Sequence, residues 1–219
     1  MEEKKRLSLK DGGIIIKFVR KAVEEWVSNN KTVHDAPSHP FFNERHGILL
    51  TLYQSGKFHG RIGYPYPIKS AADVLVRCAV SVCQDPRSPA LKSGDLKNVV
   101  AEVSILSEPH PLLKPYEKNF EPPKHGLVVV RGAKKAMMMP GDFTVKPNEA
   151  MAEIMKRAEI EKNLLNDPLT KFYKFHAQTF FETLPEGPVR EKVYAGNGKI
   201  KQAKAAKRPA RPKKSKRRK

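Results

Sequence analysis

The sequence lacks long apolar runs and paired cysteines. No stretch approaches the roughly 18 apolar residues that a membrane-spanning helix needs, and the opening MEEKKRLSLKDGG begins with acids rather than with a targeting signal. Cys78 and Cys83 have neither CxxC spacing nor a second pair elsewhere. We therefore expect a soluble cytoplasmic protein with an unprocessed N-terminus, no membrane contact, and both cysteines kept as buried thiols.

Motifs for cofactors and metals are also missing. Neither GxxxxGK[ST] nor GxGxxG occurs, and the seven histidines show no HExxH, HxH or His-Cys spacing. The sequence therefore predicts no cofactor and no metal site. His59 and His125 each lie in a predicted hairpin, and they are the best acid–base candidates if they approach one another in a cleft.

Acidic residues are absent from the last 24 residues. Residues 196–219 hold eight Lys and four Arg, and Ile200 is their one residue of apolar bulk, so this segment carries +12 of the formal +19. Such a composition cannot bury enough apolar surface to offset the entropy of ordering. We expect a domain at 1–195, with a net charge of +7, and a basic tail at 196–219 that is disordered without a partner.

The tail is predicted to bind nucleic acid. A dense run of cations without acids binds phosphate polymers such as RNA and DNA by neutralising their phosphates. Because the tail has almost no aromatic residues, we expect it to contact phosphates rather than bases. The predicted binding residues are Lys199, Lys201, Lys204, Lys207, Arg208, Arg211, Lys213, Lys214, Lys216, Arg217, Arg218 and Lys219. Further candidates for a basic surface on the domain are Arg61, Arg77, Arg87, Lys134 and Lys135.

Hydrophobic periodicity within 1–195 predicts an α+β fold. Helical spacing occurs at 13–27, at 70–85 with Ser70 as N-cap, and at 148–165. Hairpins are expected at 46–63 and 125–139, and single strands at 101–108 and 171–185. Hairpins separated by helices favour a two-lobed domain with a largely antiparallel sheet and flanking helices.

These motifs together resemble the AMMECR-type domain over roughly residues 12–190. The resemblance is carried by HGILLTLYQSGKFHGRIG, CQDPRSPA, AEVSILSEP, HGLVVV with AMMMP, MAEIMKRAEI and KFHAQTFFETLPEGPV, in that order. It implies a small α+β protein with a cleft between two lobes. It also implies a setting beside Memo-like or radical S-adenosylmethionine proteins, but it implies no defined reaction.

The chain departs from the family pattern at cleft-type positions. The family run Leu-Arg-Gly-Cys-Ile-Gly corresponds to FHGRIG at 58–63, which places His59 at the arginine and Arg61 at the cysteine. A guanidinium has no usable lone pair, so Arg61 cannot act as a nucleophile. Asp85, Pro86 and Arg87 keep the family's DPR run, whereas the family's LLLPQ appears as MMMPG at 137–141. The resemblance thus implies a retained scaffold with an altered pocket at His59, Arg61 and His125.

We therefore predict a non-catalytic RNA-binding protein. A globular domain with a basic extension is typical of ribosomal proteins, so ribosomal RNA is the favoured partner, together with neighbouring ribosomal proteins. One alternative is an enzyme, or an enzyme partner, that acts on a small molecule in the AMMECR-type cleft. Another is a DNA-binding chromatin protein, because phosphate contacts do not distinguish DNA from RNA.

Overall fold

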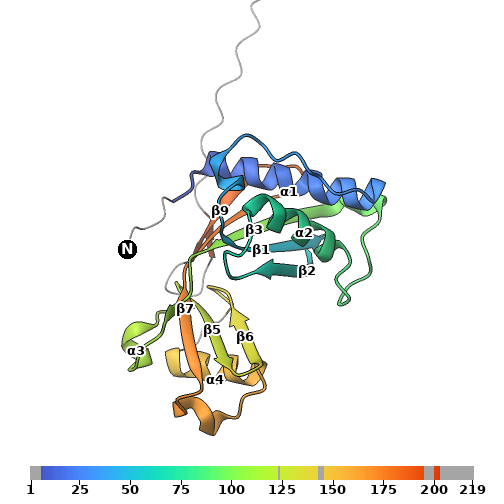
Figure 1. The fold of residues 1–219 in the computed structure, drawn as a ribbon. Helices are drawn as coiled ribbons and strands as arrows, with labels where there is room; N and C mark the ends of the chain where they lie inside the picture. Colours follow the sequence, from blue (N-terminus) through green and yellow to red (C-terminus); the bar gives the residue numbers. More distant parts are fainter. Residues whose placement is uncertain (1–5, 123, 143–145, 195–199, 203–219) are drawn as a thin grey trace, which may run out of the picture.

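The chain folds into two lobes, each built on an antiparallel sheet (Figure 1). The computed structural model describes residues 6–122, 124–142, 146–194 and 200–202. Their helices are α1 (Leu9–Asn29), α2 (Ala71–Cys83), α3 (Tyr116–Asn119) and α4 (Pro147–Arg157), with 3-10 helices η1 (Pro40–Phe42), η2 (Ser93–Asn98) and η3 (Lys162–Asn166). The predicted α+β class with antiparallel sheets and flanking helices is confirmed.

The strands divide between the lobes. The first lobe has the sheet order β10-β9-β8-β3-β1-β2, and the second has β4-β7-β5-β6. The strands of the first sheet are β1 (Gly47–Gln54), β2 (Lys57–Tyr64), β3 (Val99–Leu106), β8 (Ala177–Glu182), β9 (Val189–Tyr194) and β10 (Ile200–Gln202). Those of the second sheet are β4 (His110–Pro111), β5 (Gly126–Arg131), β6 (Lys134–Met138) and β7 (Lys171–Phe175).

Helices α1 and α2 cover one face of the six-stranded sheet. Alternate residues of β1, namely Ile48, Leu50 and Leu52, are buried with the apolar stripes of both helices. Because side chains alternate along a strand, the residues between them lie on the opposite face of this sheet. The first lobe therefore has one apolar face under the helices and one opposite face, on which Thr51, Glu102, Ser104 and Thr179 are buried.

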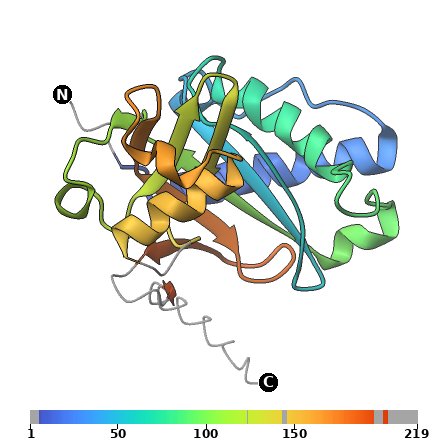
Figure 2. The same ribbon diagram turned by 90° about the horizontal axis from the view of Figure 1, so that it is seen from below.

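Helix α4 packs on the second sheet in the same way. Its Met151, Ile154 and Met155 form a core with Leu127 and with other residues of β5, β6 and β7. Figure 2 shows α4 lying across these strands. The lobes meet at a smaller apolar cluster, which consists of Leu49, Leu106, Val128, Met139 and Phe175.

The prediction of a single strand at 171–185 is wrong, because the segment forms two strands, β7 and β8. Strand β7 ends at Phe175 in the second sheet, and β8 begins at Ala177 in the first. His176 lies between them, and its backbone is held by Ser107, whose N–H donates to the His176 carbonyl at 2.9 Å. The alternation of aromatic and polar residues continues through His176, so the pattern does not reveal that the chain changes sheet there.

The predicted helix 148–165 is too long. Helix α4 ends at Arg157, and Glu159 adopts a left-handed backbone with a φ of +56°, which a continuing helix does not allow. The first helix is longer than predicted, because Ser8 and Asp11 form a capping box ahead of Gly13. The predicted N-cap Ser70 and both hairpins are confirmed.

Cys78 and Cys83 are buried free thiols, as predicted, and burial raises the pKa of each to about 12. Among the described residues, no helix combines the length and the apolar character that crossing a membrane requires.

Candidate functional site

The face of the six-stranded sheet opposite α1 and α2 carries a polar cluster that faces the second lobe. We call it the polar face, and its members are Thr51, Arg61, Glu102, Ser104, Thr179, Lys192 and Tyr194. The strand register places Thr51 between Arg61 and Glu102, and Thr179 between Ser104 and Lys192. All seven side chains therefore stand on one side of adjacent strands.

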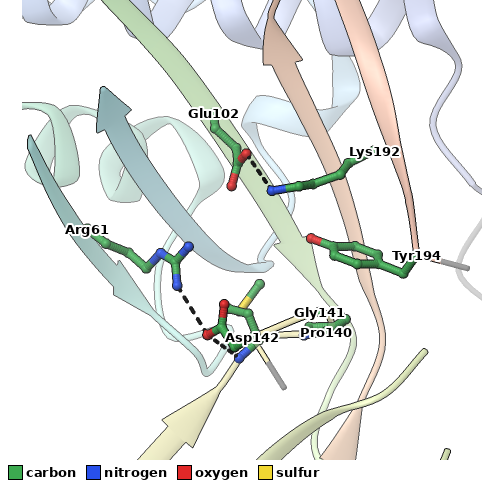
Figure 3. A pocket seen from close by; sticks show the side chains of 8 residues that line it. Arg61, Glu102, Pro140, Gly141, Asp142, Lys192 and Tyr194 are labelled. Carbon is green, nitrogen blue, oxygen red and sulfur yellow. Dashed lines mark hydrogen bonds and ion pairs between the residues drawn. The ribbon is translucent and has the colours of Figure 1, made fainter. Parts of the chain in front are cut away.

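Two ion pairs organise the polar face (Figure 3). The Lys192 Nζ donates to Glu102 Oε2 at 2.9 Å. The Arg61 Nε donates to Thr51 Oγ1 at 3.0 Å, and its Nη1 lies 3.3 Å from Oδ2 of Asp142, which follows β6 in the second lobe. Arg61 thus links the two lobes.

The space between these ion pairs is small. The pocket holds about 40 Å³ and is lined by Arg61, Glu102, Lys192, Tyr194 and residues 139–142. Ordinary small-molecule pockets measure roughly 300–1,000 Å³. Burial alone would lower the pKa of Lys192, but the charge and hydrogen bond of Glu102, together with Tyr194 and Tyr53, raise that pKa. The pocket is therefore occupied by its own charged side chains.

The glycines of the FHGRIG run allow two close backbone contacts. A Cβ on Gly60 would lie 2.7 Å from Oδ2 of Asp85, and one on Gly63 would lie 2.3 Å from the carbonyl oxygen of Ile48. Either substitution would force atoms closer than van der Waals contact allows. The run keeps these glycines because β2 packs tightly against β1 and against the segment 85–88.

The DPR run holds the outer edge of β2. The Arg87 Nη2 donates to the Arg61 carbonyl at 3.1 Å, and Ser88 Oγ donates to the His59 carbonyl at 2.6 Å. Arg87 also forms an ion pair with the buried Asp85 at 2.6 Å, and its hydrogen bond holds the pKa of that carboxyl far below the usual range. Residues 85–88 are therefore positioning residues for β2, and they cover backbone groups that an edge strand would leave exposed.

The structure does not bring His59 and His125 together, so that expectation is wrong. His59 is the extra residue of a β-bulge opposite Leu52 and Tyr53, and its buried Nε2 has no hydrogen-bond partner among the described residues. His125 instead packs near His176 and Ser107, beside the Gly47 end of β1. Gly47 and Tyr53 are six strand positions apart, about 20 Å.

His125 is a buried residue at the junction of the lobes. Its ring centroid lies 4.7 Å from that of His176, and its Nδ1 accepts from the Glu121 N–H at 3.0 Å. Nε2 therefore carries the proton of the neutral ring. Burial and the nearby charges of His176 and Lys174 lower the pKa of His125 to about 4.

We predict that His125 makes folding sensitive to acid. Between pH 6.5 and about 4 the unfolded chain binds a proton at this residue that the folded chain does not, so stability falls as the pH falls through this window. The loss reaches up to about 3 kcal/mol, at 1.36 kcal/mol per pKa unit. Urea denaturation of His125→Gln between pH 7 and 4 should give a flatter dependence than the parent. Parallel curves for the two proteins would contradict this assignment.

The predicted basic residues do not form one surface. Arg61 and Arg87 are held in ion pairs beside β2, Arg77 is exposed on α2, and Lys134 and Lys135 lie on the β5–β6 hairpin of the other lobe. Of the predicted tail residues, Lys201 lies in strand β10, which pairs with β9. The expected disorder of the tail is wrong for residues 200–202, which form strand β10. The other eleven residues, and the rest of the tail, fall outside the described residues.

Two further observations concern ligands. Within the described ranges, no group of three or more His, Cys, Asp or Glu side chains is arranged to hold a metal ion. A larger groove of about 610 Å³ lies between α3, α4 and η3, where Tyr116, Met155 and Leu165 contribute apolar walls. None of the residues singled out from the sequence lines this groove.

Sequence reasoning missed most of the polar face. Glu102 and Ser104 alternate with apolar residues in β3, which is the signal of a strand with one polar face. Lys192 and Tyr194 share one face of β9 with Arg190, but no strand was predicted at 189–194, since Glu191 interrupts the apolar face of Val189 and Val193.

Comparison with known proteins gives a consistent result. The sequence profile of the AMMECR1 family matches residues 16–180. Protein MK0488 of Methanopyrus kandleri is 31% identical over 202 residues, which cover 87% of this chain and 97% of that protein. A protein of Methanothermobacter thermautotrophicus is 32% identical over 187 residues, covering 80% and 96% of the two chains.

A solved structure agrees with these matches. The uncharacterized protein PH0010 from Pyrococcus horikoshii superposes with a TM-score of 0.77 at 28% identity, and the match covers 84% of this chain and 97% of that one. The fold, the spacing of the glycine-containing β2 run and the profile match all agree. The chain therefore belongs to the AMMECR1 family.

Proposed function

We propose that this chain is a non-catalytic RNA-binding protein that associates with the ribosome through its basic C-terminal segment, residues 196–219. The observation that carries the proposal is the density of charge, 12 cations in 24 residues without one acid. The family profile ends at residue 180, so this segment lies beyond the matched region. The positive charge of this segment therefore needs an explanation other than the function of the AMMECR1 domain.

Phosphate contact explains such a segment best. Neutralising roughly 6–10 phosphates releases condensed counterions and gives an affinity that falls about 10³–10⁵-fold between 50 and 200 mM salt. Proline and alanine between the cations do not read bases, so the expected contacts are with the backbone of a large folded RNA. Ribosomal RNA is the most abundant partner of this description.

The geometry of the polar face supports a scaffold rather than an enzyme. The position that carries a thiol in the family motif holds Arg61, and its guanidinium is bound to Thr51 and Asp142. The neighbouring charges, Glu102 and Lys192, neutralise each other across a pocket of about 40 Å³. The motif position therefore offers no nucleophile, and the pocket is small for a substrate.

Sucrose-gradient fractionation of cell lysates tests the proposal. The intact protein should sediment with ribosomal particles at low salt and leave them as salt rises. A deletion of residues 203–219, which spares β10, should stay near the top of the gradient. Identical profiles of the two proteins at every salt concentration would remove the tail and the ribosome from the account, and they would favour the small-molecule enzyme alternative.

A further inference from the structure

The face of the four-stranded sheet opposite α4 carries both apolar and basic side chains. Leu127, Val129 and Phe172 pack on α4, so the residues between them in β5 and β7 point the other way. We call this the Tyr173 face, and it consists of Val130, Lys135, Met137, Lys171 and Tyr173. It comes from three adjacent strands.

The strand register sets these side chains in two rows. Lys171, Val130 and Lys135 lie opposite one another across β7, β5 and β6. In the next row Tyr173 and Met137 flank Val128, which belongs to the cluster between the lobes. Val130, Met137 and Tyr173 all pack against that cluster. The apolar side chains of the Tyr173 face therefore pack at the junction of the lobes, whereas its two lysines are exposed.

The exposure of these residues suits a contact surface. Tyr173, Val130 and Met137 are half-buried, so each has a fixed place in the sheet and an accessible edge, whereas Lys135 and Lys171 are exposed. The lysine Cα atoms stand two strand spacings apart, roughly 10 Å. An aromatic ring and two apolar side chains thus lie beside a pair of cations.

The charges on this face are of one sign. The two rows contain no carboxylate, and neither Lys135 nor Lys171 has an ion pair with a described residue. Arg131 and Lys134, one position further along the hairpin, are already bound to Asp167 and to the carbonyl of Glu159. Within the described part of the chain, the cations available to a ligand near this hairpin are therefore those of the Tyr173 face.

A half-buried aromatic ring with two exposed lysines in the next row matches the needs of a single-stranded nucleic acid. Bases stack on aromatic rings whatever their sequence, and lysines contact the phosphates between them. We propose that the Tyr173 face binds single-stranded RNA, with Tyr173 stacking on a base and Lys135 and Lys171 contacting the neighbouring phosphates. This inference rests on the proposed function, because the tail would hold the RNA close to the domain.

The test uses the full chain and a fluorescein-labelled 12-nucleotide oligouridylate, with affinity measured by anisotropy. At 200 mM salt the contribution of the tail is weakened, whereas stacking releases few counterions and persists. Tyr173→Ala should then weaken binding about 5- to 150-fold, the range expected for removal of one stacked base. Tyr173→Phe, which keeps the ring, should bind like the parent.

The lysines give a second measurement. The double variant K135A/K171A should lower the slope of log affinity against log salt by up to about 1.4, at 0.7 per phosphate contact on a single strand. The matched control is K17A/K21A, which removes two exposed lysines from α1 and should leave the slope unchanged. Thermal melting of each variant separates impaired folding from impaired binding, and K135A/K171A keeps the test valid if Tyr173→Ala is unstable.

The failure of this inference can be told from the failure of the proposed function. If the full chain binds oligouridylate but all Tyr173-face variants match the parent, the tail binds RNA and the Tyr173 face does not. If the full chain binds neither oligouridylate nor ribosomal RNA, both proposals fall. Photocross-linking of 4-thiouridine RNA should label the peptide that contains Tyr173, and labelling confined to other peptides would overturn the inference.

Discussion

Replacing Glu182 by alanine should lower the free energy of unfolding by about 3–5 kcal/mol, the usual cost of breaking a buried ion pair. The Glu182 side chain is 3% exposed and that of Arg20 is 11% exposed. Arg20 donates from Nε and Nη2 to the two carboxylate oxygens at 2.9 and 2.7 Å, and the Ala101 N–H donates to Oε2 at 3.0 Å. The substitution would leave a buried charge and a buried N–H without this partner.

Urea denaturation measures the effect, and Glu191→Ala is its matched control. Glu191 forms an ion pair with Arg6, whose side chain is 75% exposed, and accepts from Gln178 Nε2 at 3.0 Å, so its removal should cost about 1–2 kcal/mol. A destabilisation at Glu182 no larger than that at Glu191 would mean that the link between α1 and the sheet does not stabilise the first lobe.

Deleting residues 203–219 should weaken binding to ribosomal RNA by several orders of magnitude at 50 mM salt. The deleted segment contains ten cations and no acid, and the salt slope falls by about 0.7–0.9 for every phosphate that is no longer neutralised. Strand β10 ends at Gln202, so the six-stranded sheet is kept and the melting temperature should change by only a few degrees.

A full-length variant with those ten cations changed to glutamine separates charge from length. It should bind as weakly as the deletion and show the same flattened salt slope, because the interaction is electrostatic. Binding by the glutamine variant at parental strength would show that the segment acts through something other than its charge.

Local sequence signals predicted the elements whose pattern and caps agree. The start of α2 is set by Ser70, which caps the helix at Asp73, and the first hairpin turns at Ser55 and Gly56. The cap and the turn each depend on neighbouring residues only, so both could be predicted from the sequence. The two glycines of the β2 run were recognisable in the sequence. The reason for them was not, since Gly60 is constrained by Asp85, 25 positions away.

Properties that depend on long-range packing could not be predicted. The chain changes sheet at His176 because Ser107 holds its backbone, and nothing in the pattern at 171–185 records that contact. The separation of His59 from His125 follows from the order of strands within each sheet. The Arg61–Asp142 ion pair joins residues of different lobes, so it depends on how the two lobes pack and could not be predicted from the local sequence.

The central claim is that the basic segment holds this AMMECR1-family protein on ribosomal RNA. Ultraviolet cross-linking in living cells, followed by sequencing of the nucleic acid recovered with the protein, tests it most directly. Ribosomal RNA should dominate the recovered sequences, and the yield should collapse when residues 203–219 are deleted. Recovery of mainly genomic DNA, or of nothing above the background of an uncross-linked sample, would contradict it.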